Sequence, residues 1–341
     1  MSATGVARSD EKLFDASMRK PGSVVPIPSF QMIRLAALGL LFVSGASAQV
    51  LVRQPADVSN VRSISYVDKS PPRGTAGVTL WGGHYRLQPT EDQTLANDTG
   101  FAPPAPRGNY QVSVDPASPG ATAVQAYDGE IGLNIHSASI AANLAGRFDL
   151  GTIVLGADLA TPARPFASGR KAKYSFVAKI PRSRQSNRGV SQVVAYYNLR
   201  DRVHRQSFWF GMVLFDSRGL SNQRNQGFEH AMWDKGTNQP IVQATAAHAT
   251  TLLDGGYPTT AFVGRPFPDA RSYAFVIGAP QVRAAIAMMK SRYPELAARF
   301  SDDPADYEIR HINLNPEVYA PEGSFAQIGM SVTGWQLEIV P

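Results

Sequence analysis

The chain has 341 residues, of which 43% are hydrophobic and 18% are charged, and its formal net charge is +6. This composition is that of a globular protein, and its 29 glycines and 25 prolines indicate many turns between short strands. The absence of cysteine excludes disulfide bonds, thiolate catalysis and cysteine-ligated zinc. Because the basic residues are scattered, we expect no nucleic-acid partner. The net positive charge would fit an acidic polysaccharide as well as it would fit a nucleic acid.

An apolar segment near the N-terminus, residues 32–48, has the three regions of a secretory signal peptide. Arg34 is followed by an apolar core and then by small residues that end at Ala48. The core has roughly nine residues, whereas a membrane span needs about 20, so we expect no stable membrane anchor. Cleavage after Ala48 would leave Gln49 as the N-terminus of a secreted or periplasmic protein. Residues 1–31 are then interpreted as an extension that arises from a translation start placed too early.

The body of the chain divides at about residue 120. The segment 49–120 is rich in proline and glycine and is expected to be a loop-heavy segment packed on the main body. From residue 121 onward, short apolar runs alternate with Gly, Asn, Asp, Pro and Ser, as is typical of a β-sandwich or barrel. We therefore predict a β-rich, antiparallel sandwich over 121–341, in which no repeat indicates a propeller or a solenoid.

The densest apolar and aromatic stretch, 189–219, is predicted to form a long β-hairpin. Its strands are Val190 to Leu199 and Gln206 to Asp216, joined by a loop of charged residues. The first strand presents a polar face, and the second is apolar on both faces, as expected for a central strand. The side chains that could line a groove on this hairpin are Gln192, Tyr196, Asn198 and Trp209. The alternative is that the two aromatic rings belong to the core.

One helix and two strands are predicted in the last 65 residues. The helix begins near Pro280 and carries Val282, Ala285, Ile286 and Met289 on one face. Pro294 ends or kinks it. The strands are Tyr307 to Leu314 and Gly329 to Val340.

Several strong catalytic motifs are missing from the sequence. We find no P-loop, no H-E-x-x-H helix, no G-x-S-x-G elbow and no G-x-G-x-x-G fingerprint, so nucleotide hydrolysis, zincin proteolysis and α/β-hydrolase chemistry lose their usual evidence. No cofactor or metal site is indicated, because five of the histidines are dispersed without ligand spacing. These are His84, His136, His204, His248 and His311.

The most suggestive polar cluster lies in residues 228–236, FEHAMWDKG. Residues four apart share a face in both a helix and a strand, so Glu229 pairs with Trp233, and His230 pairs with Asp234. A carboxylate beside an indole is suited to grip a sugar ring, and a histidine held by an aspartate could act as a general base. The alternative is a surface loop with ordinary ion pairs.

The C-terminal stretch AQIGMSVTGWQLEI, residues 326–339, resembles the closing strand of concanavalin A-like sandwiches, the jelly rolls of lectins, glucanases and polysaccharide lyases. The paired strands at 189–219 are similar in kind to the curved sheet of that fold. The resemblance implies a jelly roll, but the glucanase E-x-D-x-E strand and the Gln-x-His strand of the alginate-lyase-like branch are missing. No functional residue is therefore transferred from the family.

Together these observations predict an exported carbohydrate-active protein that engages a polysaccharide or oligosaccharide. If it is an enzyme, we expect a glycoside hydrolase or a polysaccharide lyase. The expected catalytic residues are Glu229 or Asp234 as acid/base and His230 as an alternative base, and the expected substrate-binding residues are Gln192, Tyr196, Asn198, Trp209 and Trp233. The alternative is a non-catalytic binding or structural module of the periplasm or cell surface. The sequence leaves the glycan and the oligomeric state open.

Overall fold

The computed structural model describes residues 47–54, 64–66, 76–82, 102–105, 109–113, 123–127, 129–137, 150–186, 188–219, 228–234, 237–245, 250–254, 265–321 and 323–341. All of them lie within one compact unit, Ala46–Pro341. The predicted extension 1–31, and the predicted signal peptide except for its last two residues, lie outside the described residues.

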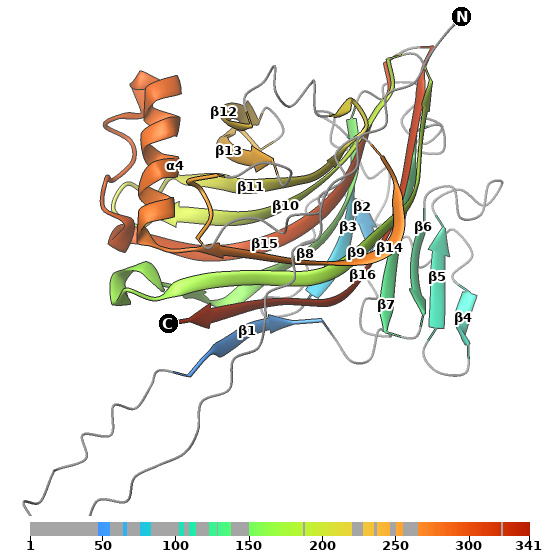
Figure 1. Cartoon of the computed structure of the whole chain (residues 1–341), viewed down its shortest axis with the longest axis horizontal. Helices are drawn as coiled ribbons and strands as arrows, with labels where there is room; N and C mark the ends of the chain where they lie inside the picture. The colour runs from blue at the N-terminus through green and yellow to red at the C-terminus, as the bar shows by residue number, and fades with distance from the viewer. Residues whose placement is uncertain are drawn as a thin grey trace, which may run out of the picture. The chain divides into compact units, whose positions relative to one another are not determined.

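The described strands form two sheets, which Figure 1 shows as two layers. Sheet A has the order β14-β9-β16-β7-β6-β5-β4, and β1 pairs with β16 at its side; sheet B has the order β12-β13-β11-β10-β15-β8-β3-β2. In sheet A the strands are β1 (Gln49–Arg53), β4 (Ala102–Ala105), β5 (Asn109–Ser113), β6 (Ala123–Tyr127), β7 (Glu130–His136), β9 (Lys171–Ser186), β14 (Phe267–Ile277) and β16 (Phe325–Val340). In sheet B they are β2 (Ile64–Tyr66), β3 (Ala76–Gly82), β8 (Leu150–Ala163), β10 (Val190–Asp201), β11 (Ser207–Asp216), β12 (Glu229–Asp234), β13 (Gln239–Thr245) and β15 (Tyr307–Tyr319).

The two sheets pack face to face around one hydrophobic core, which confirms the predicted β-sandwich. Alternate residues of β9 and β10 are buried in this core, among them Tyr174 and Tyr197. The Tyr197 hydroxyl, on sheet B, donates a hydrogen bond of 2.7 Å to the carbonyl of Phe275 on sheet A. The layers are therefore joined by a polar contact as well as by apolar packing.

The predicted hairpin is present, but its sheet is not wholly antiparallel. β10 and β11 pair antiparallel from Gln192 opposite Asp216 to Arg200 opposite Ser207. On its other side β11 pairs in parallel with β13, and β2 is also parallel to β3. The parallel pairing of β13 brings the polar cluster of β12 beside the hairpin.

The helix α4 (Ala279–Arg292) buries the four apolar side chains predicted for its inner face. It packs near β12 and β13 at one end of the sandwich (Figure 1) and is followed by the 3-10 turns η3 (Pro294–Leu296) and η4 (Pro304–Asp306); a further turn, η2 (Phe166–Ser168), precedes β9. No helix in the described ranges is long and apolar enough to cross a membrane. β15 was predicted to end at Leu314 but continues to Tyr319. Among the first five strands, β1, β4 and β5 belong to sheet A, and β2 and β3 belong to sheet B.

Candidate functional site

β12 divides the predicted polar cluster between the two faces of sheet B. His230 lies opposite Gln243 of β13 and Asp234 lies opposite Gln239, whereas Glu229 lies opposite the core residue Ala244. His230 and Asp234 therefore share the face that points away from sheet A, which we call the outer face. Glu229 and Trp233 share the opposite face.

The outer face continues across the hairpin and carries the polar residues predicted there. Tyr196 belongs with Trp209 to a small apolar cluster that is separate from the main core. The Tyr196 ring crosses Gly211, where a Cβ atom would lie 2.6 Å from Tyr196 Cδ1. The Tyr196 hydroxyl accepts a hydrogen bond from Gln243. Glycine at 211 thus lets the ring lean across β11 toward β13.

Trp209 connects this face to Asp234. The indole Nε1 donates a hydrogen bond of 3.1 Å to Thr237 Oγ1, and that hydroxyl donates one of 2.5 Å to Asp234 Oδ2. The Trp209 ring also makes edge contacts with Tyr196 and His311, each with ring centroids 5.8 Å apart. Asn198 lies between Trp209 and His311 in the register and donates to Gln239.

The structure adds a carboxyl group that the sequence reasoning missed, Glu317 on β15. It lies opposite Gln192, whose Nε2 donates a 2.5 Å hydrogen bond to Oε2, and only 9% of the residue is exposed. Burial raises the pKa of Glu317 to about 7, the hydrogen bonds from Gln192 and Asn315 oppose the rise, and the negative charge of Asp234 adds to it. Glu317 and Asp234 are thus electrostatically coupled carboxyl groups on the same face.

The same face holds two buried amide oxygens that lack partners. Asn313 and Asn315, which alternate with Glu317 along β15, are 5% and 7% exposed, and neither Oδ1 atom accepts a hydrogen bond among the described residues. Beside them, His311 Nδ1 lies 2.9 Å from Asp158 Oδ1. Unpartnered buried acceptors require an explanation, and a hydroxyl-bearing ligand would supply the missing donors.

Tyr196 is a neutral phenol in this setting. Burial raises the pKa of its hydroxyl well above the ordinary value, the charges of Glu317 and Asp234 raise it further, and the hydrogen bond to Gln243 lowers it only in part. A phenol of this kind donates or accepts hydrogen bonds, but it is a poor base.

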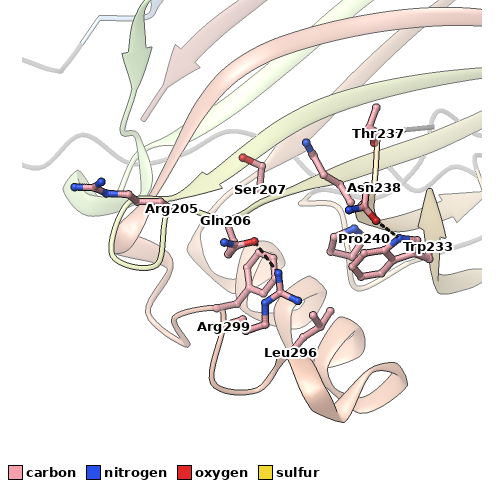
Figure 2. A pocket seen from close by; sticks show the side chains of 11 residues that line it. Arg205, Gln206, Ser207, Trp233, Thr237, Asn238, Pro240, Leu296 and Arg299 are labelled. Carbon is pink, nitrogen blue, oxygen red and sulfur yellow. Dashed lines mark hydrogen bonds between the residues drawn. The ribbon is translucent and has the colours of Figure 1, made fainter. Parts of the chain in front are cut away.

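Glu229 and Trp233 are not brought to this face. Glu229 accepts hydrogen bonds from the hydroxyl of Thr250 and from the backbone N–H of Thr251 at 2.7 Å. Trp233 makes an edge contact with Tyr293 after α4, and its Nε1 donates to Asn238 Oδ1 at 3.2 Å. The Trp233 ring lines a cavity on the helix side of sheet B (Figure 2). Of the three predicted catalytic residues, His230 and Asp234 therefore share the outer face, whereas Glu229 does not.

No group of three metal-binding side chains occurs among the described residues. The outer face presents carboxyl, imidazole, phenol and amide groups.

No family model and no curated protein matches the chain. Solved structures that match include the family 11 xylanase from Neocallimastix patriciarum, with 8% identity over 68% of this chain and 87% of that chain, and a TM-score of 0.33. A native family 12 xyloglucanase from Bacillus licheniformis has 9% identity over 71% and 91% of the two chains, and a TM-score of 0.29. The xyloglucanase domain of a type three effector from Sinorhizobium fredii, in complex with cellobiose, has 8% identity over 71% and 89%, and a TM-score of 0.25.

Proposed function

We propose that this protein is an exported glycoside hydrolase that binds a polysaccharide or oligosaccharide across the outer face of sheet B. The observation that carries the proposal is the pairing of a buried acid of raised pKa, Glu317, with the charge of Asp234 on a face lined by aromatic and amide side chains. Aromatic rings such as Trp209 stack on sugars, and amides bind their hydroxyls.

Glu317 is the general acid. With a pKa of about 7 it is partly protonated near neutral pH, and the protonated form can donate its proton to the glycosidic oxygen as the bond to the anomeric carbon breaks. Asp234, held by the hydroxyl and the N–H of Thr237, accepts a proton from the water that attacks the anomeric carbon. Glu317 thus acts as the general acid and Asp234 as the general base.

Hydrolysis is favoured over the lyase mechanism by the state of Tyr196. A lyase of this kind needs a phenolate or another strong base at the sugar ring, and the raised pKa of Tyr196 opposes ionisation. Tyr196 instead supports the substrate, together with Asn198 and Gln192. His230 lies on the same face as Asp234 and is a further ionisable group there.

Export rests on the signal-like segment 32–48. Cleavage after Ala48 would leave β1 whole, because this strand begins at Gln49 and pairs there with Ile339. Expression with the complete leader in a bacterial host, followed by N-terminal sequencing of the exported protein, tests this. We expect a chain that begins at Gln49, and retention of the uncleaved chain in the cytoplasm would contradict export.

Activity is tested by incubating the purified protein with a panel of neutral and acidic polysaccharides. New reducing ends without ultraviolet absorbance indicate hydrolysis, whereas unsaturated, absorbing products indicate a lyase. Glu317→Gln and Asp234→Asn should each abolish release of reducing ends while leaving retention on the polymer intact. Retention of the wild-type protein on one polymer without turnover would select the non-catalytic binding module instead.

A further inference from the structure

A cavity of about 220 Å³ lies at the end of sheet B where β11 begins, next to the segment that follows α4. Three parts of the chain line it: residues 205–207 where β11 begins, Trp233 with residues 237–240, and residues 296–300 after α4 (Figure 2). The volume is below the roughly 300–1,000 Å³ of a site for a drug-sized ligand and therefore suits a single ring.

The cavity exposes a mainly polar surface, and the guanidinium of Arg299 lies among its other side chains, whereas the Arg205 side chain extends away from them (Figure 2). The apolar side chains of the cavity are Trp233, Pro240, Leu296 and Phe300. The ionisable side chains among the described residues that line it are Arg205 and Arg299, and no carboxylate is among them. The cavity therefore favours a polar ligand that carries a negative charge.

Arg299 is placed to bind that charge. In Figure 2 its guanidinium rises between Gln206 and the pair Trp233 and Pro240, and it donates one hydrogen bond of 3.1 Å to Gln206 Oε1. A guanidinium has five N–H donors in a planar fork and stays charged at any physiological pH. The contact to Gln206 orients the group and leaves donors for a bidentate bond to a carboxylate.

The backbone around the cavity is held in an unusual conformation. Arg205 and Asn238, with φ angles of 60° and 55°, are the two non-glycine residues of positive φ in the described part of the chain, and both line this cavity. Positive φ is common for asparagine and uncommon for arginine, so Arg205 is the strained position of the two.

A buried carboxylate, Asp201, holds the two arginine-bearing segments together. It accepts hydrogen bonds from the N–H groups of Val203 and His204 in the hairpin loop, and from the N–H of Ser301 at 2.7 Å. The loop that carries Arg205 and the segment that carries Arg299 are therefore fixed to one another before any ligand arrives.

The cavity is also connected to the outer face. Thr237 and Gln239 line it, and these same residues bond Trp209 and Asn198 on the outer face. We propose that the cavity binds a carboxylate-bearing sugar ring, a uronate, of an acidic polysaccharide that lies across the outer face. The proposal rests on the proposed function and specifies its substrate class. After cleavage at Ala48 the chain keeps 28 basic and 24 acidic residues, and this net charge of +4 agrees with such a polymer.

Calorimetric titration of the full-length protein with trimers of galacturonate, glucuronate and mannuronate, each beside its methyl ester as a neutral match, tests the proposal. We expect one acid trimer to bind at least tenfold more tightly than its ester, and Arg299→Gln to raise its Kd about tenfold. Arg205→Asn, which keeps a residue tolerant of positive φ, should raise the Kd by a smaller factor. Arg202→Gln removes a charge from the same loop outside the cavity, where Arg202 pairs with Glu308, and should leave the Kd unchanged.

Circular dichroism and thermal unfolding of each variant show that a changed Kd does not reflect misfolding. Equal Kd values for acid and ester in all three pairs, or a Kd that Arg299→Gln leaves unchanged, would overturn the uronate site. If Trp209→Ala then still weakens the binding of neutral oligosaccharides, the outer-face function stands and only the cavity proposal fails. If no saccharide binds, both fail.

Discussion

Gln192 Nε2 on β10 donates a hydrogen bond of 2.5 Å to Glu317 Oε2 on β15. The donor is a neutral amide, so it orients the carboxyl group without supplying the positive charge that would lower its pKa strongly. Burial consequently dominates and raises the pKa to about 7. Both protonation states are populated near neutral pH, which is the condition for general acid catalysis.

Replacing Glu317 by glutamine should lower kcat/KM for glycan hydrolysis by about 10²–10⁴ with little change in KM, because the amide keeps the shape but cannot donate the proton. Steady-state kinetics on the best substrate of the panel measure this. Glu308→Gln, on the same strand but beside Arg202, should stay within about twofold of wild type. Equal losses in the two variants would remove Glu317 from the mechanism.

Glu317 should also make folding stability depend on pH. Its folded pKa of about 7 exceeds the unfolded value of 4.5, so the folded state keeps a proton that the unfolded state releases between these values. The free energy of unfolding therefore falls as pH rises from about 4.5 to 7, by roughly 3 kcal/mol. Urea denaturation across this range should show a shallower decline for Glu317→Gln than for wild type. Parallel curves for the two proteins would mean that burial does not perturb this group.

Asp201 should have the opposite dependence. Burial would raise its pKa, but the hydrogen bonds from Ser301, His204 and Val203 prevail and lower it. The carboxylate therefore contributes stability above its unfolded pKa near 4, and this contribution is lost as pH falls through the lower folded value. Asp201→Asn should cost about 1.5–3 kcal/mol at pH 7 by chemical denaturation. Asp303→Asn, at an exposed cap, should cost less, and a reversed order would contradict the central role of Asp201.

Gly211→Ala should destabilise the protein by about 1–3 kcal/mol, because the new methyl group collides with the Tyr196 ring and approaches Gln243 Cγ to 3.0 Å. In a double-mutant cycle, Tyr196→Ala should remove most of this cost. Thermal unfolding of the four proteins gives the coupling energy. Additive effects would show that the ring and Gly211 do not interact.

Trp209→Ala should raise the Kd for a bound oligosaccharide at least tenfold, because it removes the exposed part of the aromatic surface on the outer face. Trp209→Phe keeps an aromatic ring for stacking but loses the hydrogen bond to Thr237 and part of the ring surface, so its Kd should change by less than about fivefold. Titration of both variants with the same ligand compares them. An alanine variant that binds as tightly as the phenylalanine variant would exclude stacking on this ring.

Local patterns made much of the fold predictable. The alternation in 189–219 predicted β10 and β11, and the apolar face of 282–289 predicted the buried side of α4. The four-residue spacing in β12 correctly paired His230 with Asp234 on one face. Glu317 was missed because it lies beyond Leu314, where the strand was predicted to end, whereas β15 continues through Pro316 to Tyr319.

The sequence by itself determined the strands, their faces and the absence of thiol chemistry, because side-chain alternation and composition are local properties of the chain. Only the tertiary structure decided which polar residues meet. The parallel pairing of β13 with β11 brings Asp234 beside Trp209, and the pairing of β15 with β10 sets Glu317 against Gln192. Sheet order depends on long-range packing of whole faces, and no spacing along the chain records it. The same packing turned the face that carries Glu229 toward the core and formed the cavity beside Trp233.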